Sequence, residues 1–275
     1  MRRSNWYLRL GLILTAVSLL YILVGFFWTP YDPGQLSGAD RFAPPSAGHL
    51  FGCDQLGRDV FSRTLEGAGS TLIIALAVVA LGFVFGLLLG AVCGYYGGIV
   101  DAVVMRLCDA VTAFPSILLA MIIIALTGAG TYNIILALGI LFVPSFARLV
   151  RGEFLKFRQR EFVQAAVAMG YSPNRIIFRH ILPSTWPVLL SGLTIGFNNA
   201  VLSEASMSFL GIGVGPADAS LGRMLSEGQG ILFSAPWCTA FPALVVTVLI
   251  LGVGMLGEGI RENMGREGTG GSYDC

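Results

Sequence analysis

The segment Arg148–Arg179, RLVRGEFLKFRQREFVQAAVAMGYSPNRIIFR, holds seven of the 17 lysines and arginines of the chain and lies between two long charge-free runs. It is too polar to cross a membrane, because a spanning helix needs about 20 predominantly apolar residues. In membrane proteins, basic residues accumulate on the cytoplasmic side. The side on which this segment lies therefore decides how many spans the chain makes.

The composition indicates a membrane protein. Charged residues make up 12% of the 275 residues and apolar residues 55%, with a mean hydropathy of +0.76, whereas soluble domains have about 25% charged residues. Five charge-free runs are long enough to span: Leu10–Tyr31, Gly67–Val100, Ala110–Ala147, Ile181–Ser203 and Gly228–Gly257. The first ends in the bulky aromatics of GFFWTPY rather than in a small-residue cleavage site, so we expect it to remain as a span.

The run Ala110–Ala147 forms either one over-long span or two short ones, because TGAGTYN (Thr127–Asn133) interrupts it. With two spans the chain has six in total, and 13 of its 17 basic residues lie in the cytoplasm. With one span the segment of seven moves outside, leaving five basic residues inside and 12 outside. The distribution of charge thus predicts an all-α membrane protein with six transmembrane helices and both termini in the cytoplasm.

Several chemistries are excluded by the residues present. A P-loop needs Gly-Lys followed by Ser or Thr, but the only lysine is Lys156, between Leu155 and Phe157. The two histidines, His49 and His180, lie on opposite sides of the predicted membrane, and no GxSxG or HExxH motif occurs. We therefore expect no enzyme, no ATP site, no metal site and no other cofactor in this chain.

The five cysteines include no CxxC pair, which predicts neither a disulfide framework nor a zinc site. Pairing of Cys53 with Cys238 on the outer side stays open, although burial as small apolar residues is the favoured interpretation.

One ionisable residue, Glu204, lies within a predicted span, in its outer half. Ionisable residues inside membranes usually mark functional sites, so Glu204 is a candidate for lining a solute pathway. The alternative is a carboxylate that reaches the outer interface or holds a neighbouring helix. Ser208 and Phe209, on the same segment, are further candidates for the pathway or its gate. The spans hold too few ionisable residues for a proton relay, so a transporter of this kind must draw its energy from elsewhere.

The polar segment predicts a helix over Glu153–Met169 that lies on the cytoplasmic face. Gly170 is placed to end it in the left-handed conformation, and Ser172 and Pro173 are placed to begin a second helix as N-cap and first helical residue. The expected apolar face of the first helix comprises Phe154, Phe157, Phe162, Ala165, Ala166 and Met169. Its partner is either a groove of another protein, with Phe162 and Met169 as anchors, or a lipid surface. The periodicity leaves both open.

Gln164–Gly170 (QAAVAMG), followed after nine residues by HILP (His180–Pro183), resembles the cytoplasmic signature of ABC-importer permeases. In that signature Glu-Ala-Ala is followed by three residues and Gly, then by nine residues and Ile-x-Leu-Pro. Ala165, Ala166, Gly170, Leu182 and Pro183 match, whereas Gln164 stands in place of Glu and His180 in place of Ile.

Further motifs resemble the dipeptide, oligopeptide and nickel branch of that family. They are FGCDQLGRDVFSR (51–63), GYYGGIVDAVVMRLCDAVTAFP (94–115), SEASMSFLGIGV (203–214), LGRML (221–225) and GEGIRE (257–262). Their order, with the long loop after the first span, is similar to that of the second permease subunit of the pair.

The resemblance implies the type I ABC-importer transmembrane fold in a bacterial plasma membrane. It implies a heterodimer with a second permease, two cytoplasmic ATPase subunits that bind ATP and magnesium, and a substrate-binding protein on the outer face. The cargo it implies is a short peptide, with nickel or a chelated metal as the alternative; a membrane scaffold or channel needing no ATPase is the alternative from another class. The residues it assigns to ATPase docking are Glu161, Phe162, Gln164, Ala165, Ala166 and Gly170. Glutamine at 164 removes a potential salt bridge to the ATPase.

These patterns together predict four parts of the chain. They are an N-terminal arm and first transmembrane helix (1–30), an extracytoplasmic loop (31–68), the ABC transmembrane domain (69–258, with the coupling segment at 151–183) and a cytoplasmic tail (259–275).

Overall fold

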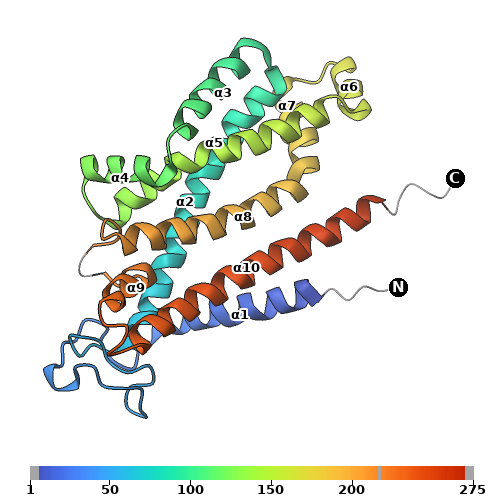
Figure 1. Cartoon of the computed structure of the whole chain (residues 1–275). Helices are drawn as coiled ribbons and strands as arrows, with labels where there is room; N and C mark the ends of the chain where they lie inside the picture. Colours follow the sequence, from blue (N-terminus) through green and yellow to red (C-terminus); the bar gives the residue numbers. More distant parts are fainter. Residues whose placement is uncertain (1–5, 216–217, 270–275) are drawn as a thin grey trace.

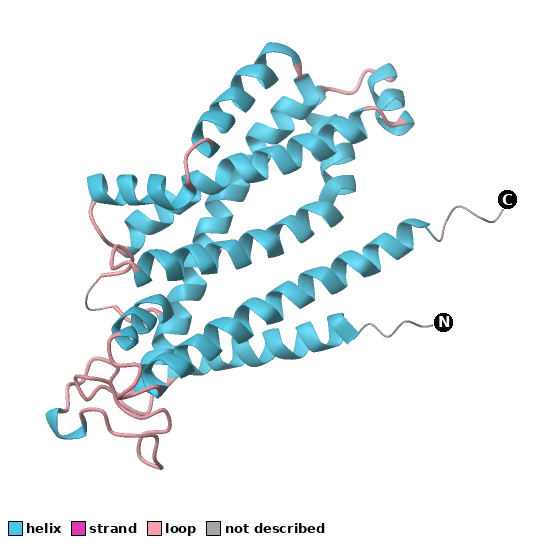
Figure 2. Ribbon diagram, viewed as in Figure 1, coloured by secondary structure: helices cyan, strands magenta, loops and turns pink. Residues whose placement is uncertain are grey.

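The structure, a computed structural model, describes residues 6–215 and 218–269, with side chains described as far as Glu262. Apart from an isolated bridge between Cys53 and Asp59, regular structure in these ranges is helical (Figure 2). The elements are α1 (Trp6–Phe27), η1 (Gly38–Asp40), α2 (Val60–Tyr96), α3 (Gly98–Thr112), α4 (Ser116–Thr127), α5 (Thr131–Arg158), α6 (Glu161–Ala168), α7 (Pro173–Ile176), the π-helical turn η2 (Ile177–Ile181), α8 (Leu182–Phe209), α9 (Leu221–Gln229) and α10 (Trp237–Thr269). The predicted all-α fold is confirmed.

Long apolar helices form the body of the protein. Helices α1, α2, α5 and α10 are each long and apolar enough to cross a membrane, and α3 and α4 together form a fifth candidate. Helix α8 has 28 residues but does not reach the same apolarity, because serines, threonines and asparagines are spread along it. It packs against α2, α5 and α10 and lies within the bundle that the four apolar helices form (Figure 1).

The charge-free run 110–147 is divided between α4 and α5, as predicted, but it does not form two straight spans. Helix α4 ends at Thr127 and α5 begins at Thr131, as the glycines between them predict. At its other end, α4 is bent by 86° from α3. Pro115 is the N-cap of α4, with a non-helical ψ of 123°. Proline disfavours continuation of the preceding helix because it lacks an N–H and restricts the residue before it. This bend was not predicted from the sequence.

The two ends of the bundle differ in structure. The start of α1, the end of α10, α6 and α7 lie at one end, and α9 with the loop between α1 and α2 lies at the other (Figure 1). The start of α1, the end of α10 and the part of the basic segment on α6 and α7 thus share one side of the bundle, which agrees with their grouping by charge.

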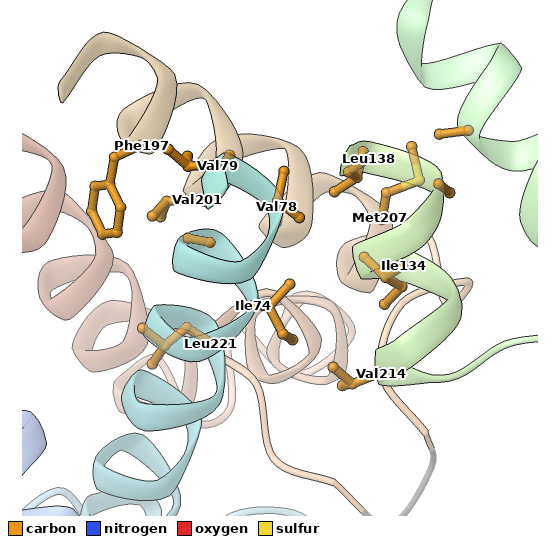
Figure 3. Packing of buried hydrophobic residues seen from close by; sticks show 14 of the residues in the cluster. Ile74, Val78, Val79, Ile134, Leu138, Phe197, Val201, Met207, Val214 and Leu221 are labelled. Carbon is orange, nitrogen blue, oxygen red and sulfur yellow. The ribbon is translucent and has the colours of Figure 1, made fainter. Parts of the chain in front are cut away.

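Four glycines bring α2 and α5 into close contact. Gly82, Gly86, Gly90 and Gly94 follow one another at every fourth residue of α2. A β-carbon on any of them would lie 2.5–2.7 Å from an atom of α5. Small residues at this spacing let helix backbones approach closely in membranes. The core beside this contact joins Ile74 and Val78 of α2 to neighbouring residues of α5, α8 and α9 (Figure 3).

The predicted single helix over Glu153–Met169 is wrong. Helix α5 ends at Arg158, Arg160 adopts an extended conformation, and α6 starts at Glu161. The break turns α6 so that Val163 and Ala166 are buried. Phe162 and Met169, the expected apolar anchors, are 44% and 64% exposed. Tertiary burial of Val163 and Ala166 therefore replaces the apolar face that the uninterrupted periodicity predicts.

Candidate functional site

Helix α6 is closed at its C-terminus by Gly170. This glycine has φ +74°. Its N–H donates to the carbonyl of Val167 at 2.9 Å, and the N–H of Tyr171 donates to that of Ala166 at 3.2 Å. This pair of hydrogen bonds is the Schellman pattern that a left-handed glycine permits. The next helix, α7, begins with Ser172 as N-cap and Pro173 as first residue, as predicted, although the Ser172 side chain makes no capping hydrogen bond.

The structure divides the predicted docking residues into two groups. Glu161, Phe162, Gln164, Ala165 and Gly170 are exposed on α6 and its C-terminal turn. Ala166 is 1% exposed and faces the body of the protein. Its expected position on the docking surface is therefore wrong, because α6 uses that face to pack against its own chain.

A buried cluster ties α6 to the long helices. Val163 and Ala166 belong to the same apolar cluster as Val150 and Phe154 of α5 and Leu189 of α8. Ile176, Ile177 and Ile181 join this cluster from α7 and η2. Protein interiors are close-packed and transmit displacement, so movement of α6 must be passed to α5 and α8.

A cleft of about 540 Å³ opens beside α6. Tyr95 and Tyr96 at the end of α2, Arg158, and Gln164 are among the residues that line it. The Gln164 side chain reaches back to the carbonyl of Gln159 at 3.4 Å. Gln164 thus combines exposure with a place on the wall of a concave surface.

A second cavity, of about 590 Å³, lies between α4, α5 and α8. Its lining is Ser116, Ile117, Leu138, Leu141, Phe142, Ser145, Phe146, Leu149, Gly192, Ile195, Gly196, Asn199, Leu202, Ser203, Ser206 and Met207. These residues are apolar or neutral and polar, and none is charged. The α8 members recur at helical spacing, with Asn199, Ser203 and Ser206 at i, i+4 and i+7 on one face. That spacing was visible in the sequence but was missed there.

The three predicted pathway residues do not line this cavity. Glu204 is fully buried, and its carboxylate accepts hydrogen bonds from Thr71 of α2 at 3.0 Å and from Ser208 at 2.7 Å. Phe209 is half-exposed at the end of α8. Successive helical residues point about 100° apart, so Glu204 turns away from the cavity that Ser203 lines. Of the two interpretations of Glu204, the contacts favour the one in which it holds a neighbouring helix.

Two ion pairs join α3 to α5. Arg151 Nη2 lies 2.6 Å from Asp101 Oδ2, and Arg148 Nη2 lies 3.3 Å from Asp109 Oδ1. Both arginines belong to the basic segment Arg148–Arg179, which these pairs join to α3.

The outer-loop motif FGCDQLGRDVFSR forms an ionic network with α9. Arg58 contacts Asp54 at 2.6 Å and Glu227 at 2.8 Å, and Arg63 contacts the same Glu227 oxygen at 3.2 Å. Asp59 caps α2 by accepting a hydrogen bond from the Ser62 N–H at 2.8 Å. The motif thus fastens the loop between α1 and α2 to the start of α2 and to α9.

Cys53 and Cys238 lie close together as free thiols. Cys238 Sγ is 3.6 Å from the carbonyl oxygen of Cys53, and both residues are buried. Burial, helped by the neighbouring carboxylates of Asp59, Asp40 and Asp54, raises the pKa of the Cys53 thiol to about 11. Within the described residues, no group of His, Cys, Asp and Glu side chains could hold a metal ion.

Comparison with known proteins identifies relatives over most of the chain. Residues 86–266 match the family described as "Binding-protein-dependent transport system inner membrane component". The dipeptide transport system permease protein DppC of Alkalihalophilus pseudofirmus is 38% identical over 260 residues, which cover 94% of this chain and 86% of that protein. The glutathione transport system permease protein GsiD of Escherichia coli O157:H7 is 41% identical over 248 residues, covering 89% of this chain and 82% of that protein.

A solved structure shares the fold. The inward-facing MetNI methionine ABC transporter aligns with a TM-score of 0.63 at 23% identity, over 73% of this chain and 95% of that one. The similarity supports the ABC-importer transmembrane architecture of the helical bundle.

Proposed function

The chain belongs to the family of binding-protein-dependent transport system inner membrane components, and we propose that it forms, with a second permease, the transmembrane pathway of an ATP-driven importer for dipeptides and oligopeptides. It is a multi-pass permease with the type I ABC-importer fold. The proposed cargo rests on the similarity over 94% of the chain to a permease named for dipeptides. The relative named for glutathione, itself a tripeptide, points to the same class of solute.

Energy enters from partner subunits in this proposal. The sequence has no P-loop, so two ATPase subunits bind ATP and magnesium and dock on α6. The exposed docking residues are Glu161, Phe162, Gln164, Ala165 and Gly170. The cleft beside α6 accepts a side chain of the ATPase, and neutral Gln164 offers it hydrogen bonds in place of a salt bridge. Closing of the ATPases then moves α5 and α8 through the buried cluster beneath α6.

The proposed orientation follows from the positive-inside rule. The end of the bundle that carries α6, the start of α1 and the end of α10 faces the cytoplasm of a bacterium, and the end with α9 faces outward. A substrate-binding protein docks on this outer end, where the loop between α1 and α2 is fastened to α9 by the network around Glu227. The predicted parts 1–30, 31–68, 69–258 and 259–275 are retained in this proposal.

The test is uptake in a strain from which the gene is deleted. Complementation with the wild-type chain is expected to restore uptake of a radiolabelled dipeptide, and purification of the tagged chain is expected to recover an ATPase and a second permease. Restored uptake of nickel but not of the dipeptide would show that the cargo is nickel and not a peptide. If purification recovers the chain without any ATPase, a membrane scaffold or channel would be the better-supported function.

A further inference from the structure

The wall that α8 presents to the 590 Å³ cavity carries polar and apolar side chains but no charged one. Asn199, Ser203 and Ser206 line it from α8, and Ser145 lines it from α5. Ser206 Oγ donates to the backbone carbonyl of Leu202 at 2.7 Å. The side chains of Asn199, Ser203 and Ser145 have no hydrogen-bond partner within the part of the chain that the structure describes. Three polar groups are therefore free to bind something that enters the cavity.

These groups cannot face hydrocarbon at low cost. An amide without a hydrogen-bond partner is strongly disfavoured in an apolar medium, and lipid offers it none. The exposed surface of α1 shows the contrast, because it carries Leu12, Ile13, Val17 and Leu20. Asn199 and its polar neighbours therefore do not face lipid, and in the proposed heterodimer this side of α5 and α8 faces the pathway shared with the second permease.

We propose that Asn199, Ser203 and Ser145 bind the peptide backbone of the solute during its passage. This inference rests on the proposed function and adds a solute contact site within the permease. The carboxamide of asparagine both donates and accepts hydrogen bonds, as a peptide group does, and serine hydroxyls do the same. The cavity falls within the range of about 300–1,000 Å³ that is usual for small-molecule sites, which suits a short peptide.

The uncharged lining also determines which properties of a solute the site does not select. With no charged side chain in the lining, the site attracts acidic and basic peptides equally. With no carboxylate, imidazole or thiol, and with Met207 as its one thioether, the lining offers no set of ligands for a transition metal. Each neutral hydrogen bond to the solute replaces a hydrogen bond to water and therefore contributes little net affinity. Because the affinity is low, the solute can leave the site. Backbone contact without a side-chain charge preference therefore suits a general peptide pathway.

The test introduces opposite charges at one position of this wall. The complete importer is reconstituted in vesicles with its second permease, ATPases and binding protein, and uptake of Ala-Lys and Ala-Glu is measured. Asn199→Asp is expected to raise the ratio of Ala-Lys to Ala-Glu uptake about tenfold and Asn199→Lys to lower it about tenfold. A unit charge about 7 Å away in water changes the uptake of each peptide about threefold, in opposite directions for the two peptides. A purely structural role of Asn199 predicts no opposite shifts.

Matched controls separate the site from a general effect of charge. Thr127→Asp and Thr127→Lys place the same charges on the exposed end of α4, outside the cavity lining, and are expected to leave the ratio unchanged. Ser203→Asp and Ser203→Lys, one turn along α8, are expected to repeat the opposite shifts and serve if the Asn199 variants do not assemble.

Three results would overturn the inference. An unchanged ratio in transporting Asn199 and Ser203 variants excludes solute contact at this wall. A shift in the same direction for Asp and Lys does so too. If the wild-type importer takes up neither dipeptide, the proposed function fails together with the inference, whereas wild-type uptake with unresponsive variants removes the inference alone.

Discussion

Thr71 of α2 donates a hydrogen bond to Glu204 of α8, with 3.0 Å between Oγ1 and Oε2. Ser208 donates to the other carboxylate oxygen at 2.7 Å. Because Ser203, the residue before Glu204, lines the solute cavity, this buried carboxyl fixes the cavity wall to α2. Its role follows from the contact between two helices and requires no contact with solute.

Replacing Glu204 by alanine is expected to lower the stability of the bundle. The hydroxyls of Thr71 and Ser208 would lose their acceptor while buried, at a cost of roughly 1–3 kcal/mol for an unsatisfied buried group. Thermal unfolding of the purified protein in detergent measures the loss, and Glu204→Gln, which keeps an acceptor oxygen, is expected to unfold closer to the wild type. Wild-type stability of Glu204→Ala combined with lost uptake would instead favour a role in the pathway.

A larger side chain at the glycine contact between α2 and α5 is also expected to destabilise the folded protein. A β-carbon at Gly86 would lie 2.5 Å from the β-carbon of Phe146, and overpacking of a close contact typically costs about 1–3 kcal/mol. Gly86→Ala should therefore lower the unfolding temperature. Gly152→Ala in α5 is the matched control, because its β-carbon would meet nothing within 4 Å. Equal unfolding temperatures for the two variants would show that α2 and α5 do not pack as closely as the structure has them.

Replacement by arginine should have different effects at two adjacent alanines of α6. Ala165 is exposed, so Ala165→Arg is expected to leave the unfolding temperature unchanged but to reduce recovery of the ATPase about tenfold or more, since a large side chain blocks docking. Ala166 is buried, so Ala166→Arg places a charge inside the cluster and is expected to unfold the segment. Both recovery of the ATPase and melting are measured. Undiminished ATPase recovery with Ala165→Arg would exclude this face of α6 from the docking surface.

The Cys53 thiol is expected to resist alkylation in the folded protein. Its pKa of about 11 lies above the ordinary value of about 8.5, so the folded state favours the protonated thiol. The resulting stabilisation is full below about pH 8.5 and is lost as the pH rises toward about 11. Iodoacetamide at pH 8, followed by peptide mass spectrometry, should modify Cys53 only after denaturation. Rapid modification without denaturant would contradict its burial.

Local chemistry explains which elements the sequence could predict. The glycines between α4 and α5, the end of α6 at Gly170 and the start of α7 at Pro173 each depend on a residue with a restricted or unusually free backbone. The turn between α5 and α6 depends instead on distant partners, since Val163 and Ala166 are buried only when the cluster with Phe154 and Leu189 forms. Periodicity along one segment cannot reveal that contact, and for this reason the sequence placed Ala166 on the wrong face.

The candidate sites show the same division. The exposed docking residues of α6 could be selected from a short contiguous motif, and their role stays a prediction. The cavity wall required three helices to be placed together, although the spacing of Asn199, Ser203 and Ser206 already defined its polar face. Glu204 was selected because charge in a span is conspicuous, and only the contact with Thr71 indicates what that charge does.

The repeat of glycines on α2 leaves its register with α5 undetermined by the contact itself. Glycines at every fourth residue match one another again after a slide of four residues, about 6 Å at 1.5 Å per residue. A shifted pair would keep most of its close approaches, so the alignment must be set elsewhere. The ion pairs of α3 with α5, Asp101–Arg151 and Asp109–Arg148, can set it, because the Gly97 turn ties α3 to the end of α2. Loss of these ion pairs would thus permit sliding rather than separation of the two helices.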